Sequence, residues 1–215
     1  MRKPNSQIPK FSNSQIVSSL PVMEQFYTIQ GEGIHSGRAA YFIRLGGCDV
    51  GCVWCDVKES WEIEGDQFIP IKEIVKNALI NPARLAVITG GEPLMHNLDA
   101  LTNELQKADF ETNIETSGAY PLSGTWNWIC LSPKKFKKPL PEIYKAANEL
   151  KVIVFNKSDF KWAEEQAARV SENCSLLLQP EWSKQASMLP LIIDYVKSHP
   201  RWRISLQTHK FMEIP

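Results

Sequence analysis

The sequence lacks an excess of charge of either sign. Its 215 residues include 24 Lys and Arg and 24 Asp and Glu, so the formal net charge is zero. Nucleic-acid-binding domains usually carry a basic excess. We therefore expect no nucleic-acid partner.

Long hydrophobic runs are also missing. No apolar stretch approaches the roughly 20 residues that a membrane-spanning helix needs. Basic residues near the start (Arg2, Lys3 and Lys10) are not followed by the apolar segment of a secretory signal. We therefore expect no membrane partner and a cytoplasmic protein. In the cytoplasm thiols stay reduced, so clustered cysteines bind metal or do chemistry more often than they form disulfides.

The chain shows no internal repeat, no low-complexity tract and no linker that would mark a second domain. Residues 1–20 are rich in Ser, Asn and Gln and have no periodicity, and we expect them to form a loose lead-in. Residues 21–215 are predicted to form a single domain, a length that can bury a sizeable core.

Short apolar runs alternate with helical patterns along the rest of the chain. Apolar stripes predict helices within 71–79, 143–150 and 189–196. Strands that are apolar on both faces and alternate with helices indicate a parallel sheet in an α/β fold. The chain is shorter than the roughly 250 residues of a full eightfold barrel, which favours an incomplete TIM-like barrel. The predicted strands are 40–46, 85–89, 112–116, 128–132, 150–155, 175–179 and 203–207.

Polar or glycine-rich residues follow nearly every predicted strand. Examples are "GGC" after 40–46, "GGEP" after 85–89 and "QTHK" at the end of 203–207. Parallel α/β folds place their sites at the carboxyl ends of the strands. We therefore expect these segments to share one site.

Three of the five cysteines (Cys48, Cys52 and Cys55) fall within eight positions. A structural zinc site needs four ligands, whereas three thiolates can hold a 4Fe-4S cluster and leave one iron open to another ligand. The spacing thus indicates a cluster with an open position, and a zinc site with a distant fourth ligand remains the alternative. Cys130 and Cys174 lie in apolar runs and are expected to be buried small hydrophobes.

The pattern Cys-x3-Cys-x2-Cys, with Trp54 before the last cysteine, resembles the radical S-adenosylmethionine (SAM) superfamily, as does "GGEP" after a strand. Further motifs, in the same order and covering 26–215, resemble the 7-carboxy-7-deazaguanine synthase family. They are "FYTIQGEG", "YFIRLGGC", "CVWCD", "TGGEP", "ETSG", "SPK", "LQP" and "SLQTHKFMEIP".

The resemblance implies a carbon–nitrogen lyase that acts in the biosynthesis of queuosine, a tRNA modification. Its substrate would be 6-carboxy-5,6,7,8-tetrahydropterin, contracted to 7-carboxy-7-deazaguanine with loss of ammonia. It also implies a 4Fe-4S cluster and SAM as cofactors, flavodoxin or ferredoxin as the reductant, and a homodimer.

The resemblance also implies site residues, carried over motif by motif. Cys48, Cys52 and Cys55 would hold the cluster that generates the radical. Substrate contacts would come from Ile29, Gln30, Gly31, Glu32, Arg44, Thr89, His209 and Pro215. SAM contacts would come from Trp54, Cys55, Asp56, Gly91, Glu92, Ser132, Pro133, Lys134, Gln179, Pro180, Glu181 and Trp182.

One position departs from the family pattern. A threonine that helps to bind magnesium usually follows the "CD" pair, and here Val57 stands in its place. Valine offers no oxygen to a hard cation that prefers oxygen ligands. The sequence thus identifies no magnesium ligand, and we expect turnover to depend less on magnesium than the family pattern implies.

Two other functions compete with this interpretation. One is a radical SAM activase that installs a glycyl radical on a partner protein, although "QGEG" and "QTHK" are not expected there. The other is a non-enzymatic metal-binding module in which the metal only stabilises the fold. Metal content and SAM binding distinguish them.

Overall fold

In the computed structural model the described residues are 18–215, and they form a nine-stranded sheet in the order β3-β1-β2-β4-β5-β6-β7-β8-β9. The strands are β1 (Ser19–Ile29), β2 (Ala39–Leu45), β3 (Phe68–Pro70), β4 (Leu85–Gly90), β5 (Glu111–Thr116), β6 (Trp128–Leu131), β7 (Glu149–Val154), β8 (Ser175–Pro180) and β9 (Trp202–Ile204). β2 and β4–β9 run parallel, whereas β1 pairs antiparallel with both β2 and β3.

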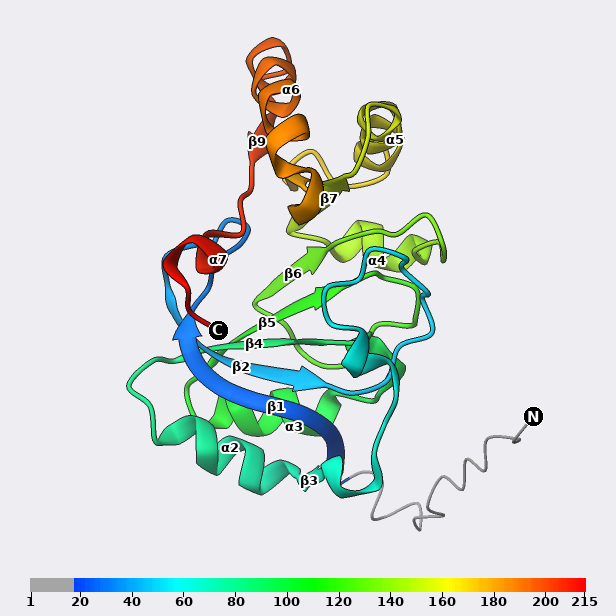
Figure 1. Ribbon diagram of the computed structural model, residues 1–215. Coiled ribbons are helices and arrows are strands. Elements are labelled where there is room, and N and C mark those ends of the chain that lie inside the picture. The colour runs from blue at the N-terminus through cyan, green and yellow to red at the C-terminus, as the bar shows by residue number, and fades with distance from the viewer. Residues whose placement is uncertain (1–17) are drawn as a thin grey trace, which may run out of the picture.

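Helices connect most of the parallel strands and lie along the outside of the curved sheet (Figure 1). They are α2 (Ile71–Leu79), α3 (Asp99–Lys107), α4 (Pro141–Ala146), α5 (Ser158–Ala167), α6 (Gln185–Ser198) and α7 (Thr208–Met212). Single 3-10 turns occur at Lys58–Trp61, Gly65–Gln67, Pro93–Met95 and Trp182–Lys184. The link from β5 to β6 contains no helix, as its short length required.

The sheet does not close into a barrel within the described residues, because β3 and β9 are its two edges. This confirms the expected α/β fold with an incomplete barrel. The C-terminal end instead returns to the tip of β1 (Figure 1), where Thr28 Oγ1 donates to the Pro215 carbonyl oxygen at 3.2 Å. The last residues of the chain therefore lie beside the first strand.

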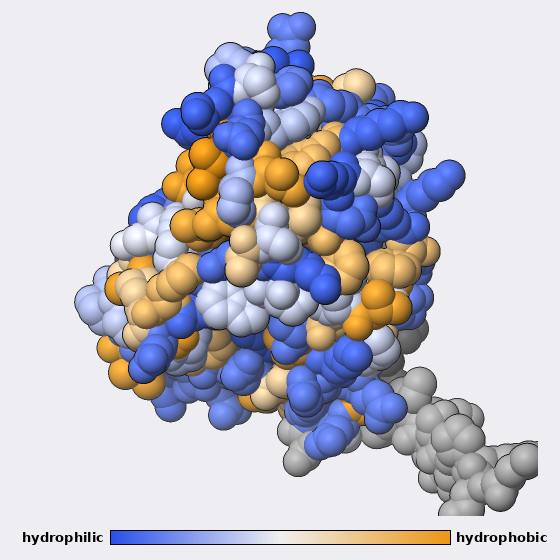
Figure 2. Space-filling model, turned by 45° about the horizontal axis from the view of Figure 1, so that its top comes forward, coloured by the Kyte–Doolittle hydropathy of each residue, from blue (hydrophilic) through white to orange (hydrophobic). Residues whose placement is uncertain are grey.

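The central strands are apolar because both of their faces are covered. Ile43, Ile88 and Ile114 are fully buried in the core between sheet and helices. On the face seen in Figure 2, hydrophobic residues gather near the centre and hydrophilic residues surround them. No helix in the part of the chain that the structure describes is long and apolar enough to cross a membrane.

Several boundaries differ from the sequence-based expectations. Residues 1–17 of the expected lead-in lie outside the described residues, whereas Ser19 and Leu20 are the first residues of β1. Leu20 was misplaced because its burial depends on β3, with which it pairs. The helix predicted within 143–150 ends at Ala146, and Leu150 is buried in β7. β9 ends at Ile204, so residues 205–207 are free to turn toward the site.

Some elements gave no usable sequence signal. β1 interrupts its apolar residues with the buried Pro21 and with Glu24, which lies on the exposed part of this antiparallel strand. α5 buries Asp159 and Gln166 alongside two alanines, which weakens its hydrophobic periodicity. α3 buries only Leu101, Thr102 and Leu105. These elements form because tertiary packing overrides weak local preference.

Candidate active site

One cavity of about 550 Å³ opens at the carboxyl ends of the strands. It is lined by residues of the segments that follow β2, β4, β5, β6, β8 and β9, and by the loop after β1. The polar segments at the strand ends therefore line one cavity, as expected. The volume is in the range of small-molecule sites.

Nearly all of the expected site residues line this cavity. They are Ile29, Gln30, Gly31, Glu32, Arg44, Cys48, Cys52, Trp54, Cys55, Asp56, Thr89, Gly91, Glu92, Ser132, Lys134, Gln179, Pro180, Glu181, Trp182, His209 and Pro215. Pro133 is the exception: it is buried and does not reach the cavity. Proline has no N–H to donate to a ligand.

The cysteine loop and the "GGEP" loop touch through their backbones. Gly91 N donates to the Leu45 carbonyl at 2.9 Å, and Glu92 N donates to the Gly47 carbonyl at 2.9 Å. A Cβ atom at Gly91 would lie 2.2 Å from that Gly47 oxygen, and Gly90 has a φ of +130°. Only glycine fits both positions. This contact fixes the loop expected to bind SAM directly against Cys48.

The three clustered cysteines all carry free thiols and line the same wall of the cavity. Burial raises the pKa of Cys48, and it raises that of Cys52 to about 11 even though Lys134 opposes the change. Among residues 18–215, no three His, Cys, Asp or Glu side chains converge on one metal ion. A cubane cluster does not require convergence, because each thiolate binds a different iron. Soft sulfur donors around one cavity fit a cluster.

Cys130 and Cys174 lie outside this group. Both are buried, and burial raises the pKa of Cys174 to about 12 and that of Cys130 well above its usual value. Cys130 Sγ donates to Glu149 Oε1 at 3.4 Å. Both are thus buried as expected, and the contact of Cys130 with Glu149 was not foreseen.

Glu92 organises two loops rather than facing the cavity with a free carboxylate. Its side chain is almost fully buried and accepts from Leu94 N at 3.0 Å, Thr116 Oγ1 at 2.5 Å, and both the N–H and the hydroxyl of Ser117. These bonds occupy both carboxylate oxygens. Glu92 thus fixes the loop through its backbone as well as its carboxylate, because its N–H donates to the Gly47 carbonyl and its carbonyl accepts from Met95 N.

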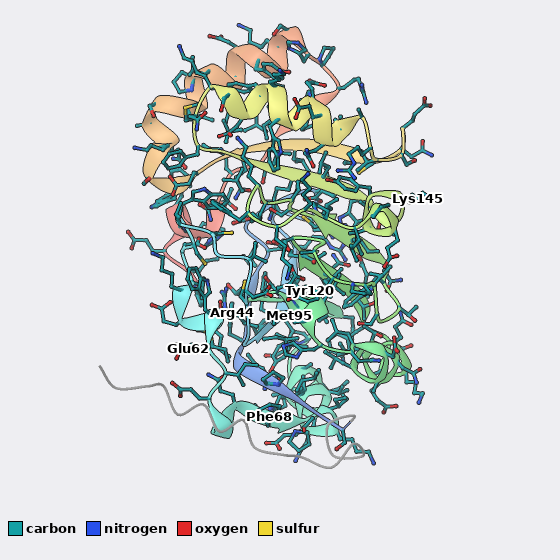
Figure 3. The ribbon with its side chains drawn as sticks, turned by 90° about the vertical axis from the view of Figure 1, so that its right-hand side faces the viewer. Arg44, Glu62, Phe68, Met95, Tyr120 and Lys145 are labelled. Atoms are coloured by element: carbon teal, nitrogen blue, oxygen red, sulfur yellow. The ribbon has the colours of Figure 1, made fainter. Side chains whose placement is uncertain are left out.

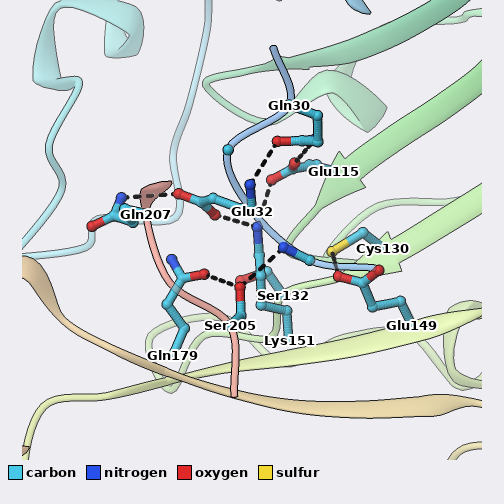
Figure 4. A network of polar contacts seen from close by, with 12 residues as sticks. Gln30, Glu32, Glu115, Cys130, Ser132, Glu149, Lys151, Gln179, Ser205 and Gln207 are labelled. Carbon is cyan, nitrogen blue, oxygen red and sulfur yellow. Dashed lines mark hydrogen bonds and ion pairs between the residues drawn. The ribbon is translucent and has the colours of Figure 1, made fainter. Parts of the chain in front are cut away.

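A buried lysine joins two carboxylates at the opposite end of the cavity (Figure 4). Lys151 Nζ lies 2.8 Å from Glu115 Oε2 and also pairs with Glu32, which accepts a further bond from Gln207 at 2.9 Å. Burial would raise the pKa of Glu32, but the charge and hydrogen bonds of Lys151 outweigh it and lower the pKa to about 2. Glu32 is therefore an ionised acceptor at neutral pH.

The side chain of Glu149 fixes the loop that carries Gln30 and Glu32 by a hydrogen bond to its backbone. Glu149 accepts from Ile34 N at 3.1 Å and from Trp128 Nε1 at 3.1 Å. A Cβ atom at Gly33, where φ is +69°, would lie 2.3 Å from Glu149 Oε1. The second glycine of "QGEG" is thus required both by its backbone conformation and by this close approach.

The C-terminal segment closes the same end of the cavity. Thr208 N donates to the Gly31 carbonyl at 2.9 Å, and a Cβ atom at Gly31 would lie 2.3 Å from His209 Nδ1. Burial lowers the pKa of His209, so its imidazole is neutral at pH 7. "QGEG" near the start and "QTHK" near the end therefore form one wall.

Arg44 reaches the cavity from β2, beside Thr89 of β4. Figure 3 shows Arg44 near the middle of the molecule, with Phe68 and Lys145 toward its outside. The Arg44 guanidinium pairs with Glu24 on the neighbouring strand β1 and lies 5.8 Å from the centre of the Phe26 ring. A guanidinium suits a carboxylate through a two-point fork.

Lys134 and Trp54 adjoin the cysteine side. Lys134 Nζ donates to the Ser132 carbonyl at 2.6 Å and to its hydroxyl at 2.7 Å, and it lies 5.8 Å from the centre of the Trp54 ring. Burial lowers the pKa of Lys134. At β8, Gln179 accepts from Ser205 Oγ at 2.6 Å, which fixes its amide beside the cavity.

Sequence reasoning assigned no role to Lys151, Glu115, Gln207 or His96, although Glu115 and Gln207 lie in the motifs "ETSG" and "QTHK". Lys151 was hidden in the apolar run "LKVIVF", where a lone lysine in a buried strand was the available signal. His96 had no assigned role, yet its Nε2 lies 2.8 Å from the Gly46 carbonyl and helps to fix the cysteine loop. No local pattern marks these contacts, because each joins residues distant in sequence.

Comparison with known proteins agrees with this arrangement. The family model for the Radical SAM superfamily matches residues 42–138. A 7-carboxy-7-deazaguanine synthase of Flavobacterium psychrophilum is 58% identical over 196 residues, covering 91% of this chain and 93% of that protein. The corresponding Escherichia coli protein is 35% identical over 221 residues, covering 90% and 98%. A crystal structure of QueE from Escherichia coli has a TM-score of 0.80 and 33% identity, covering 87% of this chain and 93% of that one.

Proposed function

The chain belongs to the 7-carboxy-7-deazaguanine synthase family, and on that premise we propose that it contracts 6-carboxy-5,6,7,8-tetrahydropterin to 7-carboxy-7-deazaguanine with loss of ammonia. The reaction is a radical SAM step of queuosine biosynthesis. One observation carries the proposal: a single cavity joins the cysteine triad to the wall formed by "QGEG" and the C-terminal segment. Neither the glycyl-radical activase nor the non-enzymatic module accounts for that wall.

Cys48, Cys52 and Cys55 would hold the 4Fe-4S cluster, with one iron left open for SAM. When bound, the cluster and SAM supply the one-electron chemistry that starts the ring contraction. The contact of Gly91 with Gly47 joins the two loops into one wall of the cavity, which supports placing SAM against that wall. Ser132, Lys134 and Gln179–Trp182 line the adjoining wall and are proposed to contact its remaining polar groups.

The other end of the cavity suits a flat, polar substrate that carries one carboxylate. Glu32, ionised because Lys151 lowers its pKa, would accept from N–H groups on the pterin edge. Gln30 and Thr89 would add polar contacts, and His209, neutral at pH 7, can donate and accept. Arg44 would bind the substrate carboxylate through two parallel hydrogen bonds of its guanidinium. The substrate would compete with Glu24, which pairs with the same guanidinium.

The magnesium site of the family pattern has weak support in this chain. Asp56 is the carboxylate beside Val57, and both line the cavity. Lys210 Nζ already lies 3.1 Å from Asp56 Oδ2, and Gln207 Nε2 lies 3.4 Å from the same atom. We propose that the Lys210 ammonium provides part of the positive charge here, so that turnover depends only weakly on magnesium.

Three further features are proposed from the family resemblance. They are a flavodoxin or ferredoxin reductant, a homodimeric assembly and a cytoplasmic location. The function itself is tested by anaerobic reconstitution of the cluster, followed by incubation with SAM, dithionite and the carboxy-tetrahydropterin. The expected result is formation of the deazaguanine product and ammonia. One equivalent of zinc without SAM binding would instead support the non-enzymatic module.

A further inference from the structure

Ser205, which follows β9, bonds through its hydroxyl to two segments that line the cavity. The hydroxyl accepts from Gly33 N at 3.0 Å and donates to Gln179 Oε1 at 2.6 Å (Figure 4). A serine hydroxyl has a single hydrogen, so these two bonds fix its direction. Ser205 is almost fully buried, and its own N–H donates to the Leu178 carbonyl at 2.9 Å. The hydroxyl is therefore held in place between the loop after β1 and the end of β8.

Gln179 also bonds to the same loop directly. Burial would raise the pKa of Glu32, but the charge of Lys151 outweighs it and lowers the pKa to about 2. A hydrogen bond between Gln179 and Glu32 adds to this lowering of the pKa. Because an ionised carboxylate can only accept, the amide nitrogen of Gln179 is the donor in that bond, while its amide oxygen accepts from Ser205. Ser205 thus sets the direction of the Gln179 amide, and with it the contact that Gln179 makes with Glu32.

Two buried side chains hold consecutive N–H groups of this loop. Ser205 accepts from Gly33 N, and Glu149 accepts from Ile34 N at 3.1 Å. Glu149 does not line the main cavity, whereas Gln179, the partner of Ser205, does. Ser205 therefore links the loop to a residue that can contact a ligand, and Glu149 supports the loop from outside the main cavity.

We propose that Ser205 is a positioning residue that couples the binding of SAM at Gln179 to the binding of the pterin substrate at the loop that carries Gly33. The inference rests on the proposed function, because only there do Gln179 and this loop contact two different ligands. Either ligand, once bound, orders residues that the other must contact, so the second ligand binds more tightly. Coupling of this kind is reciprocal, and each ligand tightens the binding of the other by the same factor.

The test measures SAM binding by the anaerobically reconstituted enzyme before any reductant is added, so that no turnover occurs. The dissociation constant of SAM is determined with and without the carboxy-tetrahydropterin, and the ratio of the two values is the coupling factor. The first variant is Ser205→Ala, which removes the hydroxyl. The second is Ser205→Cys, which keeps a side chain of similar size whose thiol is only a weak donor and a weak acceptor.

Two control variants remove hydroxyls that do not contact Gln179. The Thr102 hydroxyl in α3 is buried, donates to the Leu98 carbonyl at 2.9 Å and accepts from Thr125 N at 3.0 Å, so it makes the same kinds of bond as Ser205. Thr102 does not line the main cavity, and Thr102→Val is the matched control. Ser36→Ala removes an exposed contact of the loop after β1, in which the hydroxyl lies 3.3 Å from Thr208 Oγ1.

We expect the substrate to tighten SAM binding in the wild type, and both Ser205 variants to lower the coupling factor by roughly three- to tenfold. Both controls should keep the wild-type factor. Gln179→Met should lower the factor as well. The double variant Ser205→Ala with Gln179→Met should lower it no further than Gln179→Met alone, because the two side chains act as one unit.

A wild-type protein without coupling, or Ser205 variants that keep the wild-type factor, would overturn the proposal. So would an equal loss of coupling in Thr102→Val, because the loss of any buried hydroxyl would then have the same effect. Additive losses in the double variant would overturn it too, since Ser205 would then not act through Gln179. Product formation with dithionite is measured separately, and its absence in the wild type would instead contradict the proposed function.

Discussion

Lys151 and Glu115 face each other on β7 and β5, with Nζ 2.8 Å from Oε2, although 36 residues separate them in the chain. The same ammonium also pairs with Glu32. Lys151 is almost fully buried, and burial alone would lower its pKa, but the two carboxylates raise it well above its usual value. Lys151 and Glu32 are therefore both charged in the cavity wall at neutral pH.

Replacing Lys151 by methionine should destabilise the protein by about 2 kcal/mol at pH 7, because the half-buried carboxylates of Glu32 and Glu115 lose their cation. The pKa of Glu32 in the wild type is lowered to about 2 from 4.5. Its stabilising contribution is thus present above about pH 4.5 and is lost as the pH falls toward 2. In the variant Glu32 protonates more easily, because Lys151 no longer lowers its pKa, so the stability difference between the two proteins should shrink as the pH falls from 7 to 4.

Urea unfolding at the two pH values measures this difference. Lys145→Met, at an exposed lysine of α4, is the control. A difference that stays constant, or that grows at pH 4, would contradict the assigned charge states of Lys151 and Glu32.

Cys48→Ala, Cys52→Ala and Cys55→Ala should each abolish cluster assembly, because a cluster held by three thiolates has no spare ligand. Cys130→Ala and Cys174→Ala should retain the cluster, since neither thiol lines the main cavity. Iron content and absorbance after anaerobic reconstitution measure the outcome. Full iron content in any of the first three variants would contradict the assignment of these cysteines as cluster ligands.

Arg44→Lys should raise the KM for the substrate about tenfold or more, because an ammonium cannot replace a two-point fork. SAM cleavage without substrate should persist, since the cysteine loop is unaltered. Arg38→Lys is a matched control: Arg38 makes a two-bond pair with Glu111 and does not line the cavity. Equal substrate KM values in the two variants would rule out the proposed role of Arg44.

Deleting Pro215 should weaken substrate binding. Pro215 lines the cavity, and its carbonyl oxygen is held by Thr28 Oγ1 at 3.2 Å. The deletion removes this residue from the cavity wall. The measurement compares the substrate KM of the two proteins, with uncoupled SAM cleavage as the control. Unchanged KM would show that Pro215 does not touch the substrate.

Val57→Thr should make turnover more dependent on magnesium, because it restores a hydroxyl beside Asp56. Wild type should retain most of its rate after chelator treatment, since Lys210 already places a cation at Asp56. Initial rates of both proteins are measured against magnesium concentration. A wild type that is inert without magnesium and saturates tightly with it would show the prediction to be wrong.

The sequence by itself determined the parts of this protein that depend on local spacing. Three cysteines at Cys-x3-Cys-x2-Cys indicated a cluster, and apolar runs that alternate with helical stripes indicated a parallel α/β sheet. Because parallel strands end at one edge, the polar segments after them could be assigned to one site before their positions were known. Gly90 and Gly91 were recognised as part of the "GGEP" motif. Their close backbone contacts with Leu45 and Gly47 could not be predicted from the sequence.

Tertiary structure decided what depends on contacts between distant residues. Lys151 looked like a lone charge in an apolar strand until β5 and the loop after β1 brought Glu115 and Glu32 against it. Glu92 looked like a ligand, and its carboxylate proved to be fully engaged with Ser117 and neighbouring groups. Local propensity reports on neighbours in sequence, whereas a buried charge is stable only where the whole fold supplies its partner.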